Sequence, residues 1–174
     1  ALSLAAEYPQ CVTKLVLVDA MGLDVATAPA ANLEAMREEA FLRAAFAQTG
    51  EVTIRGDFGG VREDVRQGQE FQKQWKSREI VARLVRGQYA DPELTQKVNT
   101  IAADTLIIWG REDGVVPWQR GEVLAATMPQ ARLALIADAG HTPMREKRET
   151  FQRLLHNFLI GQGEEIERGV VVRD

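Results

Sequence analysis

The sequence is short of several residue types on which common functional sites depend. Its 174 residues include one cysteine, Cys11, two histidines and two serines. A single thiol can form neither an intrachain disulfide nor a cysteine-based zinc site, and it fits a reducing, cytoplasmic location. The chain also lacks a Gly-rich phosphate loop and any cluster of histidine and cysteine ligands. It therefore predicts neither a metal nor an organic cofactor.

Charge and hydropathy exclude two further classes of partner. The net charge of −4 and the pI of about 5.3 leave no basic footprint for nucleic acid. No apolar run approaches the roughly 18 residues that a membrane-spanning helix requires. Hydrophobic residues make up 45% of the chain, which is enough for a globular core. A small molecule remains the expected partner, and the sequence leaves the oligomeric state unknown.

Three short, continuous apolar runs predict buried strands at residues 14–19, 105–109 and 132–136. Apolar residues on both faces of a strand are typical of a parallel sheet covered by helices. Helical patterns lie between and beyond these runs. They cover residues 1–8, 117–128 and 147–160. The fold class is therefore α/β, with helices flanking a parallel sheet.

The middle of the chain interrupts this alternation with helical patterns. Asn32 predicts the N-cap of a helix reaching residue 48, a glycine-rich connection follows, and helical spacing resumes over 70–89. Asp91 and Pro92 predict the start of a further short helix. We therefore expect an α/β core from residues 1–19 and 100–160, an inserted helical subdomain over 20–99, and a frayed polar tail over 161–174.

Polar loops follow two of the predicted strands. Asp113 lies in the loop after 105–109, and His141 lies in the loop after 132–136. The carboxyl ends of parallel strands share one edge of a sheet, where ligands and catalytic groups gather. An Asp that accepts from one imidazole nitrogen leaves the other nitrogen free as a base. Asp113 and His141 are therefore candidates for an acid–base pair, although turn aspartates and loop histidines are also common without any such role.

The segments around these residues resemble the C-terminal half of an α/β-hydrolase-fold enzyme of the group with a helical cap. Such enzymes commonly show a strand followed by G-x-x-D-x-x-V-P, then a strand followed by G-H-x-P-x-x-E and an amphipathic helix. Residues 1–19 resemble the helix after the nucleophile and the strand before the cap. In this sequence the motif positions are Gly110, Asp113, Val116 and Pro117, then Gly140, His141, Pro143 and Glu146.

The resemblance implies a catalytic triad in the chain order nucleophile, Asp113, His141. His141 would act as general base and then as general acid, while Asp113 orients its ring. Glu112 and Asp19 are alternative acids, because Glu112 adjoins Asp113 and some members place the acid after the strand that here ends at Asp19. The cap, residues 20–99, would select a small, fairly apolar substrate. Its candidate contacts are Phe71 and Trp75.

The nucleophile of such a triad has no counterpart in this sequence. No G-x-S-x-G elbow occurs, and Ser3 lacks both the flanking glycines and a preceding strand. The family spacing places the nucleophile a few residues before Ala1. We therefore expect the chain to be the C-terminal portion of a hydrolase that cleaves an ester or a carbon–carbon bond. On its own it should be inactive, and the open edge of its first strand should favour self-association.

Three other interpretations stay open from the sequence. An Asp nucleophile would make the parent a dehalogenase or an epoxide hydrolase, because Asp113 and His141 serve either chemistry. A non-catalytic relative could bind a small molecule in the same pocket. An unrelated α/β domain could match these motifs by chance.

Overall fold

A parallel sheet organises the part of the chain that the structure describes. The computed structural model describes residues 1–33, 35–36, 38–47, 90–161 and 170–172. The strands are β1 (Lys14–Val18), β2 (Asp104–Gly110), β3 (Ala131–Ile136) and β4 (Val170–Val172), and they lie in that order in the sheet. Every pairing is parallel, with Lys14 opposite Asp104 and Thr105 opposite Ala131. The three predicted strands and the parallel α/β class are confirmed.

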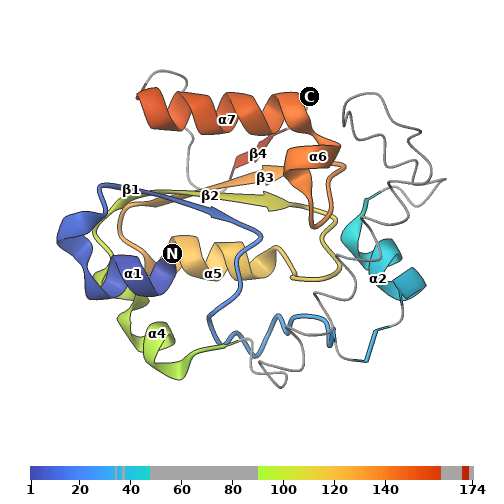
Figure 1. The fold of residues 1–174 in the computed structure, drawn as a ribbon, viewed down its shortest axis with the longest axis horizontal. Helices are drawn as coiled ribbons and strands as arrows, with labels where there is room; N and C mark the ends of the chain where they lie inside the picture. Colours follow the sequence, from blue (N-terminus) through green and yellow to red (C-terminus); the bar gives the residue numbers. More distant parts are fainter. Residues whose placement is uncertain (34, 37, 48–89, 162–169, 173–174) are drawn as a thin grey trace, which may run out of the picture.

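Helices cover both faces of this sheet. Figure 1 shows α7 (Arg148–Ile160) on one face, and α1 (Leu2–Glu7), α4 (Pro92–Lys97) and α5 (Gln119–Thr127) on the other. Short 3₁₀ turns, η1 (Pro9–Cys11) and η2 (Val98–Thr100), connect these helices to the strands. The continuous apolar runs of the sequence are explained by this sandwich, because each strand meets a helix on either side.

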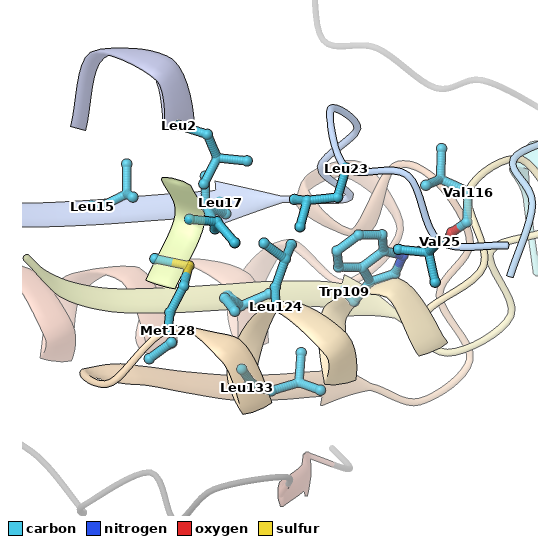
Figure 2. Close-up of a cluster of buried hydrophobic side chains, with 14 of the residues drawn as sticks. Leu2, Leu15, Leu17, Leu23, Val25, Trp109, Val116, Leu124, Met128 and Leu133 are labelled. Atoms are coloured by element: carbon cyan, nitrogen blue, oxygen red, sulfur yellow. Dashed lines mark hydrogen bonds between the residues drawn. The ribbon is translucent and has the colours of Figure 1, made fainter. Parts of the chain in front are cut away.

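The core is divided by the sheet into two clusters. Alternate residues of β2 point to opposite faces, so Ile107 and Trp109 belong to one cluster while Leu106 and Ile108 belong to the other. Figure 2 shows the larger cluster, in which Trp109 lies near Leu23, Val25 and Val116. The smaller cluster joins β2 and β3 to α7 through Leu154 and Phe158.

The cap of α4 forms as the sequence predicts. Asp91 Oδ1 accepts from the backbone N–H of Glu93 at 2.9 Å and of Leu94 at 3.4 Å, and Pro92 occupies the first helical position. The two ends of the inserted segment meet here. Gly22 forms a parallel bridge with Ala90, and Asp91 N donates to the Gly22 carbonyl at 2.8 Å.

The helix expected from Asn32 begins later than predicted. The helix α2 spans Glu38–Ala45, while Asn32 caps only a local turn, accepting from Ala35 N at 3.3 Å. The chain just before that turn is fixed elsewhere, because Ala31 N donates to the Val115 carbonyl at 2.7 Å. The helix also ends earlier than residue 48. The expected helix over 70–89 and the connection before it lie outside the described residues.

The C-terminal part contains three departures from the sequence interpretation. A short helix, α6 (Pro143–Glu146), precedes α7 and was not predicted. The amphipathic pattern over 147–160 predicts that Leu159 points inward with Leu154 and Phe158, but Leu159 is 52% exposed. The tail was expected to be frayed, yet Val170–Val172 form β4, because three consecutive valines can pair with the free edge of β3. None of the described helices has the length and apolarity to cross a membrane.

Candidate active site

The loop after β2 holds Asp113 in a tight turn. Asp113 Oδ1 accepts from the backbone N–H of Val115 at 2.8 Å and of Val116 at 2.9 Å. Both valines are fully buried, and the indole Nε1 of Trp109 donates to the Val116 carbonyl at 2.8 Å. The valines anchor the loop in the core while the backbone amides orient the carboxylate. Two amide donors also stabilise the ionised form of this carboxyl group.

His141 follows β3 and meets Asp113 across the edge of the sheet. Its Nδ1 lies 2.9 Å from Asp113 Oδ2. The Asp113 side chain has no exposed surface, whereas the imidazole is 22% exposed. An ionised carboxylate only accepts hydrogen bonds, so Nδ1 carries the proton and Nε2 is the acceptor nitrogen. The structure therefore brings together the two side chains singled out from the sequence.

Two glycines allow the two loops to approach this closely. A Cβ atom on Gly110 would lie 1.9 Å from the Gly140 carbonyl oxygen, and one on Gly140 would lie 2.4 Å from the Ala45 oxygen. Both neighbours are backbone atoms, which cannot rotate away as a side chain could. Glycine is therefore required at both motif positions by the packing of backbone on backbone.

The last turn of α2 is attached to both loops through its backbone. Gly114 N donates to the Ala44 carbonyl at 2.8 Å, and His141 N donates to the Ala45 carbonyl at 2.7 Å. Helix ends leave such carbonyls without intrahelical partners. At the described end of α2 the partners come from two loops. One is the acid loop, which follows β2 and holds Asp113, and the other is the histidine loop, which follows β3 and holds His141. These bonds explain why the helix stops at Ala45. Figure 1 shows α2 beside the edge at which β2 ends.

Glu146 accepts hydrogen bonds from the residues on either side of His141 and so holds the histidine loop in place. Its Oε1 accepts from Gly140 N at 3.0 Å, and also from the backbone N–H and the hydroxyl of Thr142. Its Oε2 accepts from Ala47 N at 2.9 Å. One carboxylate thus connects the segments on both sides of His141 to the residues just after α2. The sequence motif included Glu146, but no role could be assigned to it before these contacts were known.

Asp19 lies beside the Asp113–His141 pair in an unusual environment. It has a φ of 44° and only 7% exposure, and its Oδ1 accepts from Gly110 N at 3.2 Å. Its Oδ2 is buried and has no hydrogen-bond partner among the described residues. The pKa of Asp19 is raised from 3.8 to about 8, chiefly by burial and then by the negative charge of Asp113. The charge of Glu146 raises the pKa further, whereas the hydrogen bond from Gly110 lowers it.

Asp19, Asp113 and His141 are also the only group of potential metal ligands that the described part of the chain brings together. One ligand atom from each residue lies within 4.8 Å of the others. Asp113 Oδ2 and His141 Nδ1 are already hydrogen-bonded to each other, and Asp113 Oδ1 is occupied by two backbone amides. The donor set therefore fits a proton-transfer site better than a metal centre.

Two of the remaining sequence candidates, Glu112 and Ser3, take no part in the pair. Glu112 Oε2 accepts a hydrogen bond from the backbone N–H of Ala139 at 3.2 Å, so Glu112 does not serve as the acid for His141. Ser3 is exposed within α1 and lines a cavity of about 460 Å³ beside β1, whose lining includes neither Asp113 nor His141. Phe71, Trp75 and Ser77 lie outside the described residues.

Arg120 is a buried cation that the sequence interpretation did not single out. It lies in α5 with 5% exposure, and its guanidinium donates to the carbonyls of Leu23 and, at 2.7 Å, of Ala28. Burial lowers its pKa, against a raising effect from Asp24. Arg120 thereby fixes the chain that leaves β1. Its position on the buried face of α5 was visible in the helical spacing, but its carbonyl partners were not.

Comparison with known proteins places these features in a family. A model of the alpha/beta hydrolase fold matches residues 1–147. The chain belongs to the α/β-hydrolase fold family.

Proteins similar to this chain are named for different hydrolytic activities. A 2-hydroxy-6-oxo-6-phenylhexa-2,4-dienoate hydrolase of Comamonas testosteroni is 28% identical over 91% of this chain and 58% of its own length. A thermophilic esterase has a TM-score of 0.65 and 26% identity, with 91% and 60% of the two chains covered. A bacterial membrane phospholipase A shares the fold at TM-score 0.69 and 22% identity, over 92% of this chain and 53% of its own. The chain thus spans less than two thirds of the length of each.

Proposed function

We propose that this protein is a hydrolase in which His141 and Asp113 are the base and the acid of a nucleophile–histidine–acid triad. The observation that carries the proposal is the 2.9 Å contact between His141 Nδ1 and the fully buried carboxylate of Asp113. Asp113 fixes the tautomer with the proton on Nδ1 and stabilises the imidazolium that forms. Nε2 takes the proton of the nucleophile and then donates it to the leaving group.

The proposed nucleophile is a serine in a part of the protein that precedes Ala1. Ser3 is a poor candidate, because it is exposed in the first turn of α1 and lines a cavity that excludes Asp113 and His141. The greater length of the curated relative leaves room for an elbow upstream. The oxyanion hole would lie there too, because its donors come from the residue after the nucleophile and from an earlier loop.

The proposed substrate is a small, fairly apolar molecule with a carbon–carbon bond next to a carbonyl group. Support comes from the 28% identity to the phenylhexadienoate hydrolase over nearly the whole chain. Ester cleavage is the second candidate, supported by the 26% identity to the thermophilic esterase. Phe71 and Trp75 are the proposed apolar contacts, so replacing Trp75 by Ala should raise KM more than it lowers kcat.

The test compares hydrolysis by the chain joined to its upstream sequence with hydrolysis by two histidine variants. Loss of the dienoate chromophore and release of p-nitrophenol report the two candidate reactions. His141→Gln should lose roughly 10³-fold or more in kcat/KM. His156→Gln is the matched control, because His156 is exposed on α7 and should leave turnover unchanged. Equal turnover by the two variants would refute the triad assignment.

Two further arms test the nucleophile. A fluorophosphonate should inactivate the longer protein by labelling a serine before Ala1, whereas an Asp nucleophile would resist the reagent and favour haloalkanes or epoxides. The 174-residue chain alone should hydrolyse no p-nitrophenyl ester above its His141→Gln variant. Clear His141-dependent turnover by this chain would place the nucleophile within it and refute the upstream assignment.

A further inference from the structure

Asp19 is a buried carboxyl group that the triad as proposed does not use. It stands directly after β1, in the left-handed backbone region that residues other than glycine seldom occupy. Its position is fixed by the pairing of its own N–H with the Ile108 carbonyl at 3.2 Å and by the Gly110 N–H on Oδ1. Backbone of this kind persists only where the surrounding structure enforces it, and such positions are common at active sites.

The carboxyl group faces the acid–base pair. Its Oδ2 is buried without a hydrogen-bond partner among the described residues, and a carboxylate oxygen of Asp19 lies within 4.8 Å of ligand atoms of both Asp113 and His141. Two carboxylates this close, both shielded from water, cannot both be ionised without a large cost in free energy. Glu146 is the other acid near Asp19, and its two oxygens are held by backbone amides and a hydroxyl.

Hydrogen bonding decides which of the two carboxyl groups keeps the charge. Asp113 receives two backbone N–H groups on Oδ1 and the imidazole on Oδ2, all within 2.9 Å. Asp19 receives one backbone N–H at 3.2 Å. Each donor stabilises the ionised form, so Asp113 holds the negative charge and Asp19 holds the proton.

We propose that Asp19 and Asp113 share a single negative charge beside His141, which Asp113 carries in the intact site and Asp19 takes over when Asp113 cannot ionise. Asp19 is then a positioning residue that acts through the imidazole, a reserve acid for the pair. In the intact site its neutral carboxyl group avoids a second charge next to Asp113. The charge-sharing stands on the geometry alone, whereas its catalytic consequence rests on the proposed hydrolase function.

Carboxyl ¹³C NMR on aspartate-labelled protein tests the shared charge directly. The Asp19 signal is assigned by its loss in Asp19→Asn. In the intact chain its pKa should be about 8. In Asp113→Asn the charge next to Asp19 is removed, and Coulomb's law across a few ångströms predicts a fall of roughly one to two pKa units. Glu112→Gln is the matched control. It removes the charge of the residue next to Asp113 in the sequence, and it should leave the pKa of Asp19 unchanged.

Two results would overturn the proposal. The first is an Asp19 signal in the intact chain that titrates in the ordinary range near pH 4. This result needs only the assignment variant Asp19→Asn, and it does not depend on the folding of Asp113→Asn. The second is an Asp19 titration that is the same in Asp113→Asn as in the intact chain, which would show that the carboxyl groups do not interact. A lower Asp19 pKa in Asp113→Asn, with no change in Glu112→Gln, supports the shared charge.

The catalytic consequence has a separate readout in the longer protein with its upstream sequence. Asp113→Asn should retain turnover that rises with pH as Asp19 ionises. The double variant Asp19→Asn/Asp113→Asn should lose that rise and fall roughly tenfold below Asp113→Asn. Equal pH profiles would overturn the reserve role. If no variant shows any His141-dependent turnover, the hydrolase proposal fails, while the NMR result on Asp19 keeps its own meaning.

Discussion

Replacing Asp19 by Asn should make the protein more stable, and increasingly so as the pH rises. Asn keeps the shape of the side chain and the oxygen that accepts from Gly110 N, but it cannot ionise. In the native protein the pKa of Asp19 is raised from 3.8 to about 8, chiefly by burial. Between these values the unfolded chain releases a proton that the native state retains. The free energy of unfolding of the unsubstituted protein therefore falls as the pH rises through this range, and the fall due to Asp19 levels off above pH 8.

The size of the effect follows from the gap between the two pKa values. The gap is about 4 pKa units, and each unit is worth about 1.4 kcal/mol, so the full difference, reached above pH 8, is about 6 kcal/mol. A domain of this size has a total stability of roughly 5–15 kcal/mol. The parent protein and Asp19→Asn should be similar near pH 4 and differ by about 5 kcal/mol near pH 8. At a urea m-value of roughly 2 kcal/mol per M, the midpoint near pH 8 would move by about 2.5 M.

Urea unfolding followed by tryptophan fluorescence is a suitable assay, because Trp109 is fully buried in the core. Unfolding curves at pH 4.5, 6 and 8 would give the pH slope for each protein. Glu7→Gln is the matched control, since Glu7 is exposed at the end of α1 and its loss should leave the slope of the parent. Parallel slopes for the parent and Asp19→Asn would refute the reasoning, because they would show that Asp19 is already ionised in the folded state.

Three further substitutions test the arrangement around the site. Gly140→Ala places a Cβ 2.4 Å from the Ala45 oxygen, so the histidine loop must shift, and hydrolysis by the longer protein should fall at least roughly 100-fold, as measured by kcat/KM. Arg120→Met keeps the length of the side chain but leaves two buried carbonyl groups unpaired, which should lower the free energy of unfolding by about 2–4 kcal/mol in urea titrations. Glu146→Gln retains acceptors on one oxygen only, and hydrogen exchange at Ala47 N should quicken while exchange in β2 stays unchanged. An unchanged rate at Ala47 N would show that Glu146 does not hold the segment after α2.

The sheet and the acid–base pair could be predicted because their signals are local. A continuous apolar run such as Leu106–Trp109 fits only a strand covered on both faces, and parallel strands bring the following loops to one edge. Asp91 and Pro92 define a helix start with two adjacent residues. In each of these cases the physical cause lies within a few residues of its effect.

Features that depend on distant partners could not be predicted. The start of α2 is displaced from Asn32 because the chain before it is fixed by Val115, far along the sequence. The pairing of Val170–Val172 depends on the free edge of β3. The proton on Asp19 depends on burial and on the neighbouring Asp113, neither of which the residue type reveals. The substrate contacts expected at Phe71 and Trp75 stay predictions.

The attachment of α2 to the two loops uses backbone atoms of α2 and of Ala47, two residues after its end. The Ala44 and Ala45 carbonyls and the Ala47 N–H make these contacts, and no side chain of the three takes part. Such a joint requires no hydrogen-bonding side chain at these positions, whereas Ala45 is 1% exposed in the core and must stay small and apolar. A substitution at Ala47 can therefore leave its N–H bond to Glu146 in place, because only backbone is used. For protein engineering, Ala47 is therefore a point after which a different segment could be inserted, with the hydrogen bonds of the acid and histidine loops to α2 retained.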